Sequence, residues 1–91
     1  MYFLQVKWLH KFQEEPVVIY AELDDELWEI RKIEEFPDGT FGYADKENHT
    51  ESTELSTSQY PPLEQIASNP EFELQHIDQE EFERVWLNSH S

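Results

Sequence analysis

The sequence contains no cysteine, only two glycines and only six lysine and arginine residues among its 91 residues. Without cysteine there is no disulfide, no thiolate nucleophile and no cysteine-ligated zinc. Two glycines are too few for a glycine-rich loop that cradles phosphate. The lack of disulfides suits the reducing cytoplasm, which is where we expect the protein to reside.

Long apolar runs are absent as well. No stretch approaches the roughly 20 apolar residues that a membrane span requires, and the first residues lack the basic and apolar regions of a signal peptide. A chain of this length supports one modest core and leaves little room for a deep substrate cavity. We therefore expect a soluble single domain over residues 1–91 that does not contact membranes.

Acidic residues are the most prominent feature of the composition: 21 Asp and Glu against six Lys and Arg give a formal net charge of −15. Such a surface repels nucleic-acid phosphates and attracts basic proteins. The cations at Lys7, Lys11, Arg31 and Lys32 are too diluted by acids to form a phosphate track, so we expect no direct nucleic-acid binding. A second interpretation stays open, in which the acidity only keeps the protein soluble or reflects a salt-adapted source.

Aromatic residues make up 14% of the chain, far more than an acidic disordered tail would contain. We therefore expect a real core built around large rings. Trp8 and Trp86 lie on clear apolar faces and are predicted core residues. Trp28 stands in a charged segment, so it is either a core residue or an exposed binding anchor.

Two-residue periodicity in the first half predicts strands. The third segment shows a phase shift near Ile33 that indicates a bulge, although Leu27, Ile30 and Ile33 would also fit a short helix. A Pro-Asp-Gly turn then closes a hairpin. The predicted strands are residues 2–10, 17–23, 27–36 and 41–44, with a loop and a short edge strand around residues 50–55.

The second half predicts helices. Pro62 suits the first turn of a short helix over residues 63–68, which Asn69-Pro70 would end. Residues 72–76 fit an extended segment. Asp78 and Glu81 form a capping-box-like start for a helix over residues 79–88. The predicted fold class is α+β, an antiparallel meander of about four strands with two short C-terminal helices, the last packed on one sheet face.

No constellation of residues indicates catalysis. The histidines at positions 10, 49, 76 and 90 match no metal-ligand spacing, and the serines have no nucleophile elbow. Adjacent carboxylates are expected by chance in so acidic a chain and usually form solvated faces. We therefore predict no catalytic residues, no metal, no cofactor and no enzymatic activity.

Several blocks of the sequence resemble a family of small bacterial domains of unknown function. These blocks are Trp28-Glu29-Ile30-Arg31-Lys32, the Asp38-Gly39 turn, Gly42-Tyr43-Ala44 and Glu81-Phe82-Glu83-Arg84-Val85-Trp86. The resemblance covers most of the chain and brings no catalytic residues with it. It implies an association with toxin–immunity loci, and therefore an inhibitor role.

Charge and resemblance together give the hypothesis of an immunity-type inhibitor that neutralises a basic toxin, such as a nuclease. Complementary charge would speed the encounter, and aromatic anchors would supply affinity. The alternatives are a phage-type nucleic-acid mimic that inhibits an anti-phage nuclease complex (an anti-CRISPR or anti-restriction protein) and a housekeeping domain. The predicted partner-binding residues are Asp24, Asp25, Glu26, Trp28, Glu29, Glu34, Glu35 and Asp38.

Overall fold

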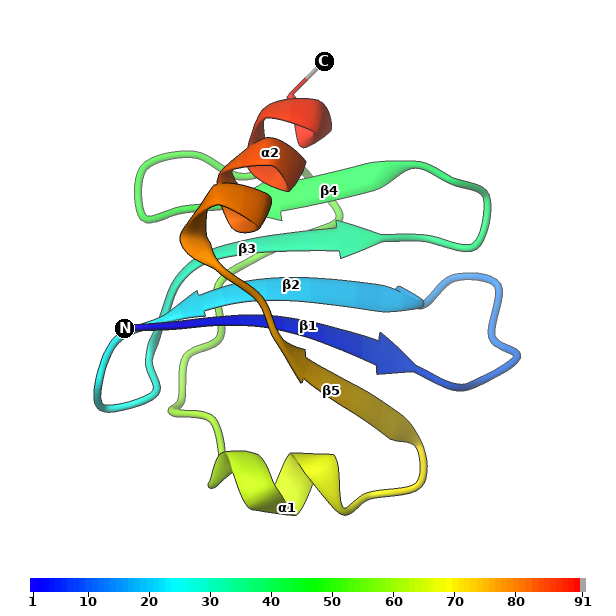
Figure 1. Ribbon diagram of the computed structural model, residues 1–91. Coiled ribbons are helices and arrows are strands. Elements are labelled where there is room, and N and C mark those ends of the chain that lie inside the picture. Colours follow the sequence, from blue (N-terminus) through cyan, green and yellow to red (C-terminus); the bar gives the residue numbers. More distant parts are fainter. Residues whose placement is uncertain (91) are drawn as a thin grey trace.

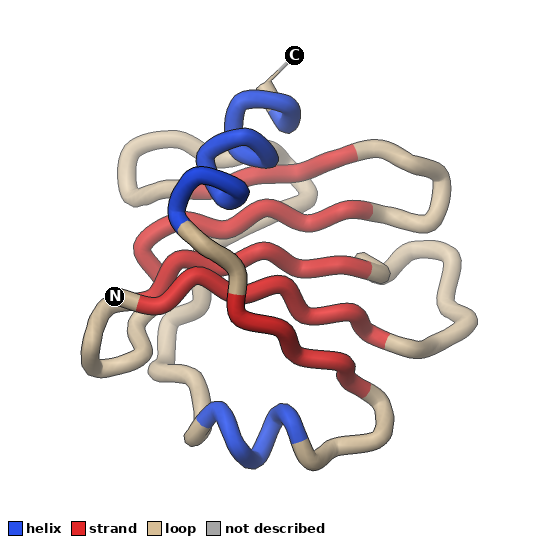
Figure 2. Tube along the Cα trace, viewed as in Figure 1, coloured by secondary structure: helices blue, strands red, loops and turns tan. Residues whose placement is uncertain are grey.

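A computed structural model describes residues 1–90 and shows one antiparallel five-stranded sheet with two helices (Figures 1 and 2). The predicted α+β class is confirmed. The strands lie in the order β4-β3-β2-β1-β5, so the first four form the expected meander and β5 joins beside β1. The elements are β1 (Tyr2–Trp8), β2 (Val18–Leu23), β3 (Glu29–Glu35), β4 (Phe41–Ala44), α1 (Leu63–Ala67), β5 (Phe72–His76) and α2 (Gln79–Ser89).

The fifth strand is the main difference from the sequence prediction. The segment expected only to be extended pairs with β1 along its whole length, with Leu4 opposite His76 and Trp8 opposite Phe72. The edge strand expected around residues 50–55 is not formed; that segment consists of turns and coil, and the isolated bridge between Ala44 and His49 lies just before it. Periodicity does not show which of these two segments forms an additional strand, because the tertiary arrangement decides which one lies beside an edge of the sheet.

The alternative of a helix near Ile30 is excluded, because this segment lies in β3. The predicted bulge is confirmed: Leu23 lies opposite Glu29 while its neighbour Glu22 lies opposite Arg31, so β3 carries one extra residue. This shift explains the change in apolar phase along β3.

The two faces of the sheet are covered by different parts of the chain (Figure 1). On one face, α2 packs through Phe82, which is fully buried and lies 5.4 Å from the Phe3 ring. On the other face, Leu4, Val6, Ala21 and Leu23 form the core, and residues from α1, β5 and the long connection before α1 pack against it. We call that connection, residues 45–62, the connecting segment.

The start of α2 follows the sequence prediction. Asp78 Oδ1 accepts a hydrogen bond of 2.8 Å from the backbone N–H of Glu81, which satisfies one of the free donors of the first helical turn. Glu80 and Glu81 in that turn complement the helix dipole. Across residues 1–90, neither helix is long and apolar enough to cross a membrane.

Candidate functional site

The turn between β2 and β3 is shaped by Asp24. Its Oδ1 accepts hydrogen bonds from the backbone N–H groups of Glu26, at 2.9 Å, and Trp28, at 3.0 Å. Leu27 adopts a left-handed backbone conformation with φ of 70°, which is uncommon for a branched side chain. The Asp24 carboxylate is therefore committed to holding the turn.

The same turn exposes three of the predicted partner-binding residues. Asp25 is 87% exposed and forms an ion pair of 2.7 Å with the N-terminal ammonium group, which holds the pKa of Asp25 below its ordinary value. Glu26 is exposed, and Trp28 is 40% exposed. The exposure of Trp28 favours the anchor interpretation over a place in the core. We call Asp25, Glu26 and Trp28 the acidic turn.

Two further candidates, Asp38 and Glu35, lie at the opposite end of β3. Asp38 Oδ1 accepts hydrogen bonds from the Thr40 backbone N–H, at 3.0 Å, and hydroxyl, at 2.7 Å, and these bonds lower the pKa of Asp38. Glu35 is half-buried at the end of β3. Gln13, Glu14, Phe36, Asp38, Thr40 and Ser52 line a shallow hollow of about 340 Å³ at this end.

The predicted acidic patch is therefore split. The β2–β3 and β3–β4 turns flank the seven residues of β3, which span about 20 Å at the usual rise per residue (Figure 1). This separation exceeds the Debye length of about 8 Å at physiological salt, so the two groups act as separate surfaces.

Glu29 lies in the interior and cannot contact a partner in this conformation. Its side chain is 1% exposed. The carboxylate accepts hydrogen bonds of 2.5 Å from the Tyr60 hydroxyl and from the Ser56 backbone N–H, and pairs with Lys32 Nζ at 3.2 Å. These contacts fasten the connecting segment to β3. We call Glu29, Lys32, Ser56 and Tyr60 the buried polar cluster.

Glu34 is also mostly covered. Its Oε1 accepts a hydrogen bond of 2.8 Å from the Thr53 hydroxyl, and burial raises the pKa of Glu34. Thr53 is 1% exposed and lies over Gly42, where an added Cβ would sit 2.1 Å from the Thr53 hydroxyl oxygen. Glu34, like Glu29, thus helps to hold the connecting segment.

Sequence reasoning missed the residues that fix α2 to the sheet. Arg31 Nε donates a 2.5 Å hydrogen bond to Glu22, and its two terminal nitrogens donate to the Glu83 carboxylate. The guanidinium lies 4.9 Å from the Phe82 ring centroid and 5.1 Å from that of Trp86. Glu22 and Glu83 are far apart in sequence, so no local pattern pointed to this cluster.

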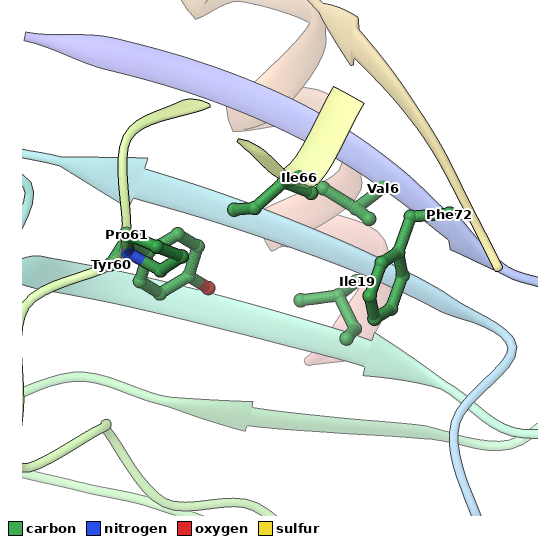
Figure 3. Close-up of a pocket in the computed structure, with 6 residues that line it drawn as sticks. All are labelled: Val6, Ile19, Tyr60, Pro61, Ile66 and Phe72. Atoms are coloured by element: carbon green, nitrogen blue, oxygen red, sulfur yellow. The ribbon is translucent and has the colours of Figure 1, made fainter. Parts of the chain in front are cut away.

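An apolar hollow of about 270 Å³ lies between α1 and the sheet, on the face opposite α2 (Figure 3). It is lined by Val6, Ile19, Tyr60, Pro61, Ile66 and Phe72. Tyr60 and Pro61 come from the connecting segment, Ile66 from α1, Val6 and Ile19 from the paired strands β1 and β2, and Phe72 from β5. No local pattern in the sequence indicates this hollow, because it forms only where five separate segments meet.

The polar side chains of this region are engaged with one another. Within residues 1–90, no three His, Asp or Glu side chains are grouped to hold a metal ion. Burial and the neighbouring Glu29 carboxylate raise the pKa of Tyr60 far above neutrality, so its hydroxyl stays protonated as a donor to Glu29. The polar groups of the buried polar cluster therefore bond to one another.

Comparison with curated proteins and with solved structures finds no match. A family model described as a domain of unknown function (DUF6881) matches residues 2–91. This match spans the whole sheet and both helices, and it agrees with the small uncharacterised domain expected from the motifs. The chain belongs to the DUF6881 family.

Proposed function

We propose that this domain is a protein-binding inhibitor of the immunity type, which neutralises a basic protein such as a nuclease toxin. The observation that carries the proposal is the imbalance of exposed charge. Thirteen acidic side chains are exposed, against four basic ones at Lys7, Lys11, Lys46 and Arg84. The exposed acids are Glu14, Glu15, Asp25, Glu26, Asp38, Glu47, Glu51, Glu54, Glu64, Glu71, Glu73, Asp78 and Glu80.

Internal ion pairs account for the two remaining cations. Arg31 and Lys32 are turned toward Glu22, Glu83 and Glu29, so they add little positive potential to the surface. A surface of one sign attracts partners of the opposite sign and raises the rate of encounter. The lack of cysteine fits a cytoplasmic setting for this encounter.

The acidic turn is the docking surface that we propose. Glu26 supplies exposed charge, Asp25 adds an exposed carboxylate that is paired with the N-terminal ammonium group, and Trp28 supplies an exposed ring of the kind that dominates binding energy at interfaces. The surface is preorganised, because Asp24 bonds and the Leu27 conformation fix the backbone that carries all three. A fixed surface loses little conformational entropy on binding.

Affinity capture from the native host tests this function. The full chain is immobilised and exposed to lysate at about 0.05 M and about 0.5 M salt. We expect recovery of one basic nuclease at the lower concentration and its loss at the higher one. Recovery of a multisubunit nuclease complex would favour the nucleic-acid mimic instead. Recovery of no basic protein, or capture that salt leaves unchanged, would overturn the proposal.

A further inference from the structure

The loop between β1 and β2, residues 9–17, is held together by one side chain. Backbone bonds tie its two ends to the sheet: the Trp8 N–H donates to the Val17 carbonyl at 2.9 Å, and the Leu9 N–H donates to the Glu71 carbonyl at 2.7 Å. Between these ends, every hydrogen bond that residues 10–16 make within the described part of the chain involves the imidazole ring of His10. We call residues 9–17 the β1–β2 loop.

The two ring nitrogens of His10 have opposite roles. The Pro16 carbonyl oxygen lies 2.7 Å from Nε2 and can only accept a hydrogen bond, so Nε2 carries a proton. The Phe12 backbone N–H donates to Nδ1 at 2.9 Å, so Nδ1 carries none. The ring is therefore neutral in this structure, and main-chain groups on both sides fix its tautomer.

A second proton on this ring would break one of its two bonds. The proton would occupy Nδ1 and turn that nitrogen from an acceptor into a donor, which would face the donating N–H of Phe12. The bond from Nε2 to the Pro16 carbonyl would remain. Histidine is the side chain whose ordinary titration falls between about pH 5 and pH 8, so this change occurs in a physiological range of pH.

The ring bonds of two other histidines differ in this respect. His49 Nδ1 lies 2.8 Å from the Thr50 carbonyl oxygen, and His90 Nδ1 lies 2.7 Å from the Trp86 carbonyl oxygen, so both nitrogens donate. A second proton would enter these rings at Nε2 and leave both bonds in place. Within residues 1–90, His10 is therefore the histidine whose ring accepts a bond from a backbone N–H.

The His10 ring also packs between two aromatic rings of the chain. Its centroid lies 4.4 Å from that of Trp8 and 5.5 Å from that of Phe12. Phe12 is 64% exposed and Leu9 is 51% exposed, so the loop presents apolar side chains to solvent. We propose that the β1–β2 loop is a pH-sensitive element, in which neutral His10 holds Phe12 in place and protonation of His10 releases residues 11–15.

No ion pair competes with this role of the ring. Charged side chains are present in the loop itself and on the residues whose carbonyls bond to its ends, namely Lys11, Glu14, Glu15, Glu35 and Glu71. Across residues 1–90, none of these carboxylates pairs with His10. The hydrogen bond from Phe12 is therefore the specific contact that distinguishes the neutral ring from the protonated one.

Nuclear magnetic resonance of the full chain tests this element. Ring nitrogen shifts show which nitrogen of His10 carries a proton, and hydrogen exchange gives the protection factor of the Phe12 amide at about pH 8 and about pH 5. We expect Nδ1 to be unprotonated at the higher pH. The Phe12 protection factor should fall about tenfold at the lower pH, the ratio that loss of one hydrogen bond produces.

Three variants separate the ring's protonation from other effects of acid. His10→Asn provides an oxygen as many bonds from the backbone as Nδ1, which accepts from Phe12 and cannot be protonated, so protection should be equal at both pH values. His10→Gln has no acceptor at that position, and protection should be low at both. His49→Gln removes a ring whose bond survives protonation and should keep the wild-type pH dependence.

The outcomes are distinct from those for the proposed function. Phe12 protection that is equal at both pH values in the wild type, or a pH dependence that persists in His10→Asn and His10→Gln, would overturn the pH-sensitive loop. The loop lies at the end of the sheet opposite the β2–β3 turn, so either result leaves the docking surface at the acidic turn unaffected (Figure 1).

Discussion

Arg31 of β3 and Glu83 of α2 form a two-pronged ion pair, with nitrogen–oxygen distances of 2.9 Å and 2.6 Å. Arg31 also bonds to Glu22 on β2, whose side chain is only 6% exposed. One guanidinium thus joins two strands to the last helix. These bonds hold the pKa of Arg31 above its ordinary value and lower the pKa of Glu83.

This geometry predicts unequal effects of removing the two partners of the ion pair. Arg31→Met leaves the buried Glu22 carboxylate unpaired and should reduce the free energy of unfolding by about 3–5 kcal/mol. Glu83→Gln changes the more exposed partner, whose side chain is 41% exposed, and leaves Arg31 paired with Glu22, so it should cost about 1 kcal/mol or less. Urea unfolding measures both. The double variant Glu22→Gln/Arg31→Met should recover part of the loss, and equal costs for the two single variants would contradict this account.

Glu34 predicts a pH dependence of opposite sign to that of Glu83. Burial raises the pKa of Glu34 in the folded state, so the folded state binds a proton at Glu34 more tightly than the unfolded state does. The free energy of unfolding therefore falls as the pH rises above 4.5, the ordinary pKa of this carboxyl, because the charged form is disfavoured in the fold. Glu34→Gln keeps an acceptor for the Thr53 hydroxyl and carries no charge. We expect it to be more stable than the wild type at pH 7 and to lose this advantage in acid.

Urea unfolding between about pH 4 and pH 8 compares the two proteins across this range. A variant that is less stable than the wild type by the same amount at every pH would show that Glu34 acts only through its hydrogen bond to Thr53.

Substitution of Gly42 should cause a steric clash, whereas substitution of Gly39 should not. An alanine at position 42 would place its Cβ against Thr53, so Gly42→Ala should displace the connecting segment and cost about 2–3 kcal/mol. Gly39→Ala meets no atom but is strained by its φ of 88°, and should cost about 1–2 kcal/mol. Hydrogen exchange distinguishes them: only Gly42→Ala should speed exchange at Thr53 and Ser56. Faster exchange at these amides in both variants would contradict the contact.

Tyr60→Phe tests the buried polar cluster. The substitution removes the hydroxyl that donates to Glu29 while keeping the ring, and a buried carboxylate left with one donor fewer should reduce the free energy of unfolding by about 1–3 kcal/mol. Thermal unfolding gives the size of the effect. Phe36→Leu, at another half-buried ring, controls for changes in packing alone. A stability equal to that of the wild type would mean that Lys32 and Ser56 suffice for Glu29.

The sequence predicted the local features and missed those that depend on distant contacts. The meander, the bulge in β3 and the Asp78 cap follow from periodicity and turn chemistry over a few residues. The choice of residues 72–76 as the fifth strand depends on β1, whose paired residues lie 64–72 positions earlier in the chain. The sequence shows where the acidic residues are but not which of them are exposed. Glu29 and Glu34 were therefore predicted to lie on the surface, although Tyr60 contacts Glu29 and Thr53 contacts Glu34 in the folded protein.

The affinity of the captured basic partner for charge-reversed variants tests the central claim most directly. Calorimetry compares Asp25→Lys/Glu26→Lys with two variants of equal net charge, Glu47→Lys/Glu51→Lys in the connecting segment and Glu14→Lys/Glu15→Lys at the other end of the sheet. We predict that the first variant weakens binding at least a hundredfold, as loss of contacts worth about 3 kcal/mol would do, while the other two change it less than tenfold. Equal weakening by all three would contradict a docking surface at the acidic turn.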